Sequence, residues 1–275
     1  MMREHLLYEK KDHIAYLTLN RPEVYNAFSV PMLERWSEAL EDAQNSPEIR
    51  VIILRGKDKV FCTGGDVKAM LDNEGFLGHD QDKKYWGSTA LARKNALWKL
   101  IHKVPLLLES IDKPIIASID GIALGAGLDM ALMCDIRIAS DTAKFSTGYV
   151  KMGLLPGDGG AYFLPRLVGV AKALELLLTG EFFDAEKALK YGVVNRVVAH
   201  SELENETLKL ANSIADNPPI SIQIIKRAIY QSLDCSLRMH LDYICSQMAI
   251  VSELEDHKEG LNAFKEKRNP LFKGK

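Results

Sequence analysis

Backbone amides at two glycine-rich turns are the groups in this sequence best suited to chemistry. One turn spans 61–66 (FCTGGD) and the other 121–127 (GIALGAG); each follows a short apolar run and precedes a segment that reads as a helix. The first N–H groups of a helix have no partner within it and lie at its positive end. If the amides of Gly65 and Ala126 converge, they could stabilise negative charge on one carbonyl oxygen, as acyl or enolate chemistry requires.

The same turns have a simpler interpretation as tight connections between a strand and a helix. A dinucleotide site would need G-x-G-x-x-G directly after the first strand and an acid about twenty residues further on. Gly121 and Gly125 are too far apart for that motif. The sequence also has no G-x-x-x-x-G-K-[ST], no G-x-S-x-G and no H-E-x-x-H, and no histidine falls in a glycine turn. These absences argue against nucleotide-phosphate binding, Ser-His hydrolysis and a zinc or other metal site.

Three side chains are candidate proton carriers. Asp129 lies within the first turn of the helix expected after Ala126, so it could act as a base or only complement the helix dipole. Asp158 is surrounded by Pro156 and three glycines, as a turn former often is, but it could equally reach into a cleft as a second carboxylate. Tyr149 could donate a hydrogen bond to a substrate, although a place in the core is the preferred interpretation.

Composition restricts the classes of function and the compartment. The chain has 275 residues, is 47% hydrophobic and carries a formal net charge of −2. It can bury a sizeable core, and its charge gives no support for nucleic-acid or membrane-surface binding. No run approaches the roughly 18 apolar residues of a membrane helix, and the first eleven residues are too charged for a secretory signal. The four cysteines form no C-x-x-C pair, so we expect reduced thiols in a cytoplasmic protein.

The elements that must position these groups change in character along the chain. Up to about residue 200, short β-branched runs alternate with glycine turns and helical segments, which predicts a mixed α/β core over 1–200. The expected strands are 5–8, 13–19, 50–55, 134–139, 143–145 and 192–198, together with the apolar runs that begin at Pro114 and Val60 and lead into the glycine turns. A long helix is expected over 83–110, and a helix broken at Pro165 and Gly169 over 164–179. A helical C-terminal region follows over 201–275, with helices near 201–215, 219–233, 236–254 and 255–267.

Six short segments, taken in order, resemble the crotonase (enoyl-CoA hydratase/isomerase) superfamily. Each is weakly specific alone, but the six together span nearly the whole chain. They are 19–22 with 26–27 (LNRP, NA), 61–66 (FCTGGD), 121–127 (GIALGAG), 155–160 (LPGDGG), 192–195 (GVVN) and 259–267 (EGLNAFKEK).

The resemblance implies an α/β fold of the ClpP/crotonase type, a spiral of ββα units with a helical C-terminal trimerisation region. It implies a homotrimer or homohexamer, acyl-CoA thioester substrates, and no metal or redox cofactor, with coenzyme A present only as part of the substrate. The family's oxyanion hole falls on the N–H groups of Gly65 and Ala126, where Ala126 replaces a more usual glycine. The residues that match CoA-contacting positions are Val24 and Lys68, with Phe264 and Lys267 from a neighbouring subunit. Glu23 stands where some members have a lysine.

The acids differ from the hydratase pattern of two glutamates. Asp129 stands at the first of those positions, Tyr149 at the second, and Asp158 lies one residue from an aspartate that some isomerases and dehalogenases use. We therefore expect an enzyme of the enoyl-CoA hydratase/isomerase type with Asp129 and Asp158 as proton carriers. One alternative is a hydrolase of a C–C or thioester bond, and another is a weakly catalytic acyl-CoA-binding protein. Acyl specificity is expected from a loop within 72–98.

Overall fold

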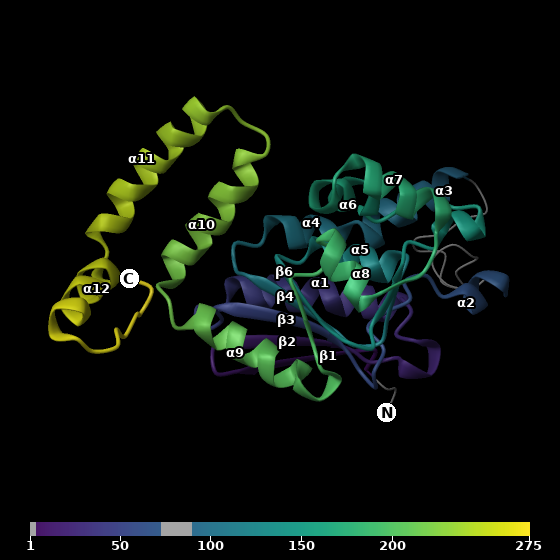
Figure 1. Ribbon diagram of the computed structural model, residues 1–275, viewed down its shortest axis with the longest axis horizontal. Helices are drawn as coiled ribbons and strands as arrows, with labels where there is room; N and C mark the ends of the chain where they lie inside the picture. The colour runs from purple at the N-terminus through teal and green to yellow at the C-terminus, as the bar shows by residue number, and fades with distance from the viewer. Residues whose placement is uncertain (1–3, 73–89) are drawn as a thin grey trace.

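Figure 1 shows a β-sheet covered by helices and a helical tail that extends from one end. The structure is a computed structural model that describes residues 4–72 and 90–275. The large sheet has the order β1-β2-β3-β4-β6-β9, with β1 and β2 antiparallel and every later neighbour parallel. Its strands are β1 (Leu6–Lys11), β2 (Ile14–Leu19), β3 (Val51–Gly56), β4 (Ile115–Ile119), β6 (Ile136–Ser140) and β9 (Arg196–Val198).

The central strands are buried on both faces, and their sequences reflect it. Parallel strands covered on both sides are expected as continuous apolar runs, and all five residues of β4 (IIASI) are buried. In β3, Ile52 packs into the core shared with the helix α1 (Val30–Asn45), whereas Ile53 points to the opposite face. There it packs in a second cluster with residues of α9 (Leu203–Ala215).

A second, smaller sheet carries one of the glycine turns. It is formed by β5 (Ile122–Leu124), β7 (Lys144–Ser146) and β8 (Phe183–Asp184). The apolar run before the other glycine turn is not a full strand, because it joins this sheet only through a single bridge between Cys62 and Ala123. That bridge places the two turns side by side.

The helix expected over 83–110 is interrupted within its described part. It consists of α3 (Ala90–Ala96), a π-helical turn η3 (Leu97–Ile101) and α4 (Lys103–Ser110). Apolar periodicity does not distinguish an α-helix from one with a π turn, so the sequence did not predict this interruption.

Two further boundaries correct the sequence-based expectations. Pro165 lies inside α6 (Gly160–Val168), where its fixed φ is compatible with the helix, and the break comes only at Gly169 before α7 (Val170–Thr179). The strand expected from residue 192 begins only at Arg196, because Gly192, with φ of 81°, caps α8 (Ala185–Tyr191). The amides of Val193 and Val194 still bond to the carbonyl of Ala188 in that helix.

The C-terminal helices lie where the sequence predicted them. They are α9, α10 (Pro219–Ser232), α11 (Leu237–Glu253) and α12 (Glu255–Glu266), and the last three extend away from the sheet. The base of this tail is held by Lys226, whose Nζ lies 2.8 Å from Asp135, and by an ion pair between Arg227 and Asp112. No helix within the described ranges is both long and apolar enough to cross a membrane.

The close approach of the two turns makes Gly127 intolerant of any side chain. A Cβ at this position would lie 2.2 Å from the carbonyl oxygen of Cys62, a backbone atom that cannot move without displacing the turn. We expect Gly127→Ala to lower the free energy of unfolding by about 3 kcal/mol or more, measured by denaturant titration.

Gly260→Ala is the matched control for this prediction. Gly260 lies inside α12. A Cβ on it would make only an ordinary contact with the ring of Phe272, at 3.7 Å. Alanine is favoured over glycine in a helix interior by about 1 kcal/mol, so this variant should be as stable as the parent or more so. Equal stability of both variants would contradict the packing argument.

Candidate active site

The two glycine turns contact each other through their backbones. The amide of Cys62 donates to the carbonyl of Ile122 at 3.0 Å, and the amide of Leu124 donates to the carbonyl of Cys62 at 2.9 Å. A Cβ on Gly64, whose φ is 73°, would meet the amide nitrogen of Ala126 at 2.7 Å. Segments about sixty residues apart in sequence therefore form one surface.

Two N–H groups on this surface have no hydrogen-bond partner within residues 4–72 and 90–275. Ala126 is the first residue of α5 (Ala126–Met133), so its amide is one of those that the helix leaves unpaired. Gly65 directly precedes Asp66, the N-cap of α2 (Val67–Leu71). Among the described residues, neither amide has a hydrogen-bond acceptor. Both are therefore free to donate to a bound group.

Asp129 is fully buried, one turn into α5. Burial raises the pKa of its carboxyl to about 7, and the hydrogen bond from Tyr149 opposes part of that shift. The amides of Gly160 and Asp158 also lower this pKa, yet Oδ1 of Asp129 has no well-formed hydrogen bond within the described part of the chain. A carboxyl that titrates near neutral pH is suited to exchanging protons with a substrate.

Tyr149 connects the two candidate acids. Its hydroxyl lies 2.7 Å from Oδ2 of Asp129 and 3.1 Å from Oδ2 of Asp158. Tyr149 also packs against the core, so the preferred interpretation of its ring was correct but incomplete. Burial and the two carboxyls raise the pKa of Tyr149 far above its usual range, so the phenol keeps its proton. That single proton can be donated to only one carboxyl at a time.

Asp158 enters the site from the loop between η4 (Tyr149–Met152) and α6. It is 6% exposed, and its Oδ1 has no hydrogen-bond partner among the described residues. Burial raises the pKa of its carboxyl, while the Tyr149 hydrogen bond and then the nearby His102 act in the opposite direction. Asp158 is thus a second buried carboxyl beside Asp129 and more than a turn former.

The glycine after this loop makes room for the acid pair. A Cβ on Gly160 would lie 2.2 Å from Oδ1 of Asp129. Gly160 therefore serves packing against the carboxyl of Asp129, which the sequence pattern alone did not reveal.

His102 is a neighbour of the site that sequence reasoning missed. Its Nε2 lies 2.7 Å from the carbonyl oxygen of Gly157, the residue before Asp158. The two residues are 55 positions apart, and no local motif indicated their contact.

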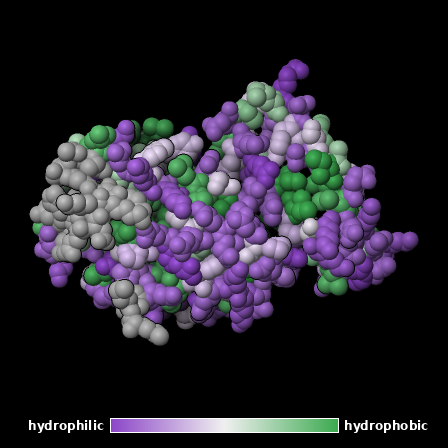
Figure 2. Space-filling model, turned by 180° about the vertical axis from the view of Figure 1, so that it is seen from behind, coloured by the Kyte–Doolittle hydropathy of each residue, from purple (hydrophilic) through white to green (hydrophobic). Residues whose placement is uncertain are grey.

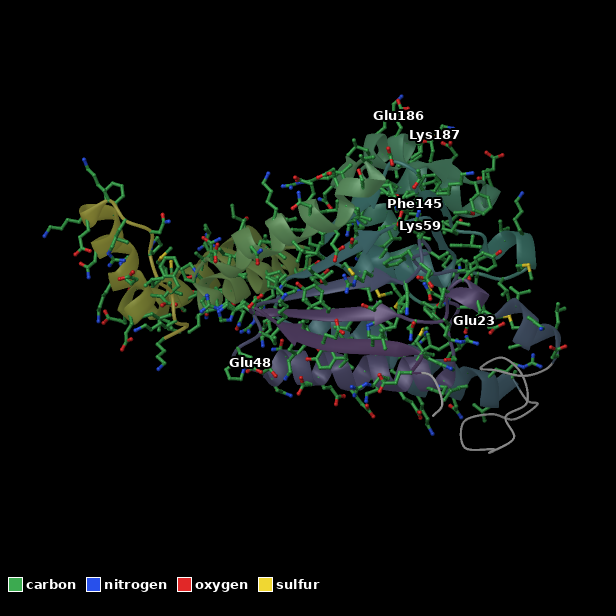
Figure 3. All side chains as sticks on the ribbon, turned by 90° about the horizontal axis from the view of Figure 1, so that it is seen from below. Glu23, Glu48, Lys59, Phe145, Glu186 and Lys187 are labelled. Carbon is green, nitrogen blue, oxygen red and sulfur yellow. The ribbon has the colours of Figure 1, made fainter. Side chains whose placement is uncertain are left out.

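The predicted CoA-binding residues Val24 and Lys68 lie next to the glycine turn at 61–66. Val24 belongs to the short helix η1 (Pro22–Val24), and Lys68 is exposed on α2. An ion pair of 3.2 Å between Arg21 and Asp66 joins the loop of Val24 to the start of α2. Figure 3 shows Glu23 at the same end of the molecule.

Phe264 and Lys267 lie elsewhere in the chain. They stand at the end of α12, at the opposite end of the molecule from α2 (Figure 1), and Phe264 is 87% exposed. Their predicted role in CoA binding thus requires a second subunit, as the resemblance implied.

Most of the segment expected to set acyl specificity, 73–89, lies outside the described residues. Within 4–72 and 90–275, no three His, Cys, Asp or Glu side chains are grouped as metal ligands.

Comparison with known proteins decides the family. Residues 9–275 match the family model described as enoyl-CoA hydratase/isomerase. The chain belongs to this family. It is an enzyme of the enoyl-CoA hydratase/isomerase type, and an acyl-CoA thioester is the implied substrate.

Relatives within the family catalyse different reactions. A short-chain-enoyl-CoA hydratase of Clostridium acetobutylicum is 34% identical over 269 residues, which are 98% of this chain and 97% of that protein. An (E)-benzylidenesuccinyl-CoA hydratase of Thauera aromatica is 36% identical, covering 97% of this chain and 98% of the relative. A trans-2-decenoyl-[acyl-carrier-protein] isomerase of Streptococcus mutans is 33% identical over 98% of both chains. Overall identity therefore does not select among these reactions.

The fold prediction is confirmed by a solved structure. The enoyl-CoA hydratase from Bacillus anthracis superposes with a TM-score of 0.88 at 33% identity, covering 98% of this chain and all of that one. The enoyl-CoA hydratase/isomerase chain thus has the crotonase-like α/β fold with C-terminal helices.

The raised pKa of Asp129 predicts a specific dependence of stability on pH. The folded carboxyl titrates at about 7 and the unfolded one near 3.8, so between these values the folded state binds more protons. Stability is then lost as pH rises through this window. We expect the unfolding free energy of Asp129→Asn to increase relative to that of the parent from pH 4 to pH 8, by on the order of 3 kcal/mol.

The measurement is the unfolding free energy of parent and variant at each pH. Asp58→Asn makes the same chemical change at an exposed turn and reports the effect of the substitution itself. A constant difference between parent and Asp129→Asn across the window would show that Asp129 is already ionised at pH 4.

Proposed function

We propose that this enzyme stabilises a thioester enolate on the N–H groups of Gly65 and Ala126. The observation that carries the proposal is the contact between the two glycine turns, each of which has an amide without an acceptor among the described residues. The amide of Ala126 lies one helical turn before the buried carboxyl of Asp129. The thioester oxygen accepts from both amides, which lowers the energy of the enolate relative to the neutral ester. No cofactor is needed beyond the CoA of the substrate.

Asp129, Asp158 and Tyr149 move the protons. In a hydration, one carboxylate takes a proton from water as the oxygen attacks C3, and the enolate then takes a proton at C2. In an isomerisation, the carboxylate takes a proton from one carbon, and the conjugated enolate is protonated at the other. Both reactions need one carboxyl ionised and a proton available nearby, which the Asp129–Tyr149–Asp158 arrangement supports.

A hydrolysis of a C–C or thioester bond is the second candidate. It is favoured by Tyr149, which stands where hydratases have a glutamate and which could hold a water with Asp158. Catalytically weak acyl-CoA binding is less well supported, because Asp158 supplies a second carboxyl despite the tyrosine.

The reaction class is tested by mass spectrometry of products from a panel of acyl-CoAs of differing chain length and ring content. Addition of water indicates hydration, unchanged mass with a shifted double bond indicates isomerisation, and free CoA indicates thioester hydrolysis. A cleaved or ring-opened acyl-CoA indicates C–C hydrolysis. Tight binding of acyl-CoAs without turnover across the panel would indicate a catalytically weak acyl-CoA-binding protein.

Removal of either ionisable carboxyl should impair catalysis more than binding. We expect Asp129→Asn and Asp158→Asn each to lower kcat by about 10²- to 10⁴-fold, the usual contribution of general acid–base catalysis, with KM changed little. Steady-state kinetics on the best substrate of the panel provide the measurement, and Asp58→Asn is the control. Full kcat/KM in both variants would place the proton carriers elsewhere.

We further propose that the enzyme is a homotrimer or a dimer of trimers, in which α12 of one subunit completes the CoA site of the next. The tail exposes apolar side chains that a monomer would not need to display (Figure 2). They include Ile225, Ile229, Leu233, Leu237, Met239, Leu241, Met248, Ile250, Leu261 and Phe264. We also propose a cytoplasmic location, which is supported by the absence of a disulfide among the four cysteines, all of which lie in the described residues.

Subunit mixing tests this arrangement. An Asp129→Asn subunit lacks its own base, and a subunit with Phe264→Ala and Lys267→Ala lacks the tail contacts, so each homo-oligomer should be weakly active. Refolding the two together creates sites that combine an intact Asp129 with an intact neighbouring tail. We expect activity above the mean of the separate variants, and a strictly additive result would contradict the shared site.

A further inference from the structure

His102 occupies an unusual place in the backbone. It follows the π-helical turn η3, and its amide donates to the carbonyl of Leu97, five residues earlier, at 2.8 Å. Single π turns within helices are rare and are frequent at functional sites. The ring of His102 packs edge-on against Trp98, with 5.7 Å between ring centroids. This ring contact restrains the orientation of the imidazole.

The ring of His102 also contacts the loop that carries Asp158. Nε2 of His102 lies 2.7 Å from the carbonyl oxygen of Gly157. A carbonyl can only accept, so Nε2 must carry the hydrogen. Nε2 is therefore the donor whether the imidazole is neutral or protonated.

This loop has few other anchors. Its amides at Gly153 and Leu154 bond back to η4, but within the described residues Leu155, Pro156 and Gly157 make no other backbone hydrogen bond. Leu155 is 76% exposed, so packing holds it weakly. The bond from His102 is thus the main restraint on the chain just before Asp158.

The position of Asp158 has consequences for the whole acid cluster. Its carboxyl meets Tyr149 at 3.1 Å, a longer contact than the 2.7 Å between Tyr149 and Asp129. A small displacement of Gly157 would break the longer contact first. His102 is also close enough to lower the pKa of Asp158, which opposes the effect of burial.

We propose that His102 is a positioning residue, whose Nε2–H holds the Gly157 carbonyl and so fixes Asp158 against Tyr149. This inference rests on the proposed function, in which Asp158 is a proton carrier. His102 itself does not touch the substrate.

Three substitutions of His102 distinguish the effect of its hydrogen-bond donor from the effect of its ring contact with Trp98. His102→Gln places an amide N–H near the position of Nε2, whereas His102→Asn is too short to reach Gly157. His102→Phe keeps the ring contact with Trp98 but has no donor. We expect the Asn and Phe variants to lose about tenfold or more in kcat, because misplacing a catalytic group by about 1 Å can cost up to 10²-fold. KM should change by less than about twofold, and the Gln variant should stay within about threefold of the parent in kcat.

Amide hydrogen exchange in the absence of substrate gives a readout independent of activity. The amides of residues 157–160 should exchange about tenfold faster in the Phe and Asn variants than in the parent and the Gln variant. Thermal unfolding identifies any variant that is globally destabilised.

Parental kcat and parental exchange in His102→Phe would overturn the proposal. So would equal losses in all three variants, because an amide N–H near the position of Nε2 would then fail to restore activity. If the parent turns over no acyl-CoA, the proposed function fails, while hydrogen exchange still decides whether His102 holds the loop.

Discussion

The contact between the backbone of Cys62 and the turn at 125–127 is the constraint on which the site depends. Gly127 lies so close to the carbonyl of Cys62, and Gly64 so close to the amide of Ala126, that neither position has space for a side chain. Cys62 adds a further restraint, since its sulfur accepts from the amide of Gly64 at 3.3 Å and its thiol donates to the carbonyl of Asn26 at 3.1 Å. Burial raises the pKa of this thiol to about 12, so it stays neutral in that role.

Burying the acid cluster lowers the stability of the folded protein. Two carboxyls and a phenol lie together away from water, and one oxygen of each carboxyl lacks a hydrogen bond among the described residues. Buried polar groups without partners destabilise a protein. Such an arrangement is found where carboxyls with raised pKa values serve proton transfer. The cluster is therefore a candidate for proton transfer, as the proposed function requires.

In the proposed site the second acid comes from a loop. Tyr149 stands where the resemblance to hydratases would place a glutamate, and the loop nine residues later brings the carboxyl of Asp158 to 3.1 Å from the Tyr149 hydroxyl. Relatives of similar identity include hydratases and an isomerase. Overall similarity therefore does not select one of these reactions for this chain.

The sequence alone determined the elements whose signals are local. Apolar runs such as that of β4, glycines at turns and the periodicity of the four C-terminal helices depend on neighbours a few residues away, so the α/β core, the paired turns and the tail were predictable. The identities of Gly65, Ala126, Asp129, Asp158 and Tyr149 as candidates also came from sequence.

Only the tertiary structure decided how these groups meet. The hydrogen bonds from Tyr149 to both acids, the contact of Gly160 with Asp129 and the reach of His102 to Gly157 join separate elements. The π turn before His102 was missed because apolar periodicity does not distinguish it from an α-helix. The helical Pro165 was missed because proline was taken as a helix breaker. Local propensity differs by about 1 kcal/mol between most residues, which is less than the free energy of burying a single large side chain.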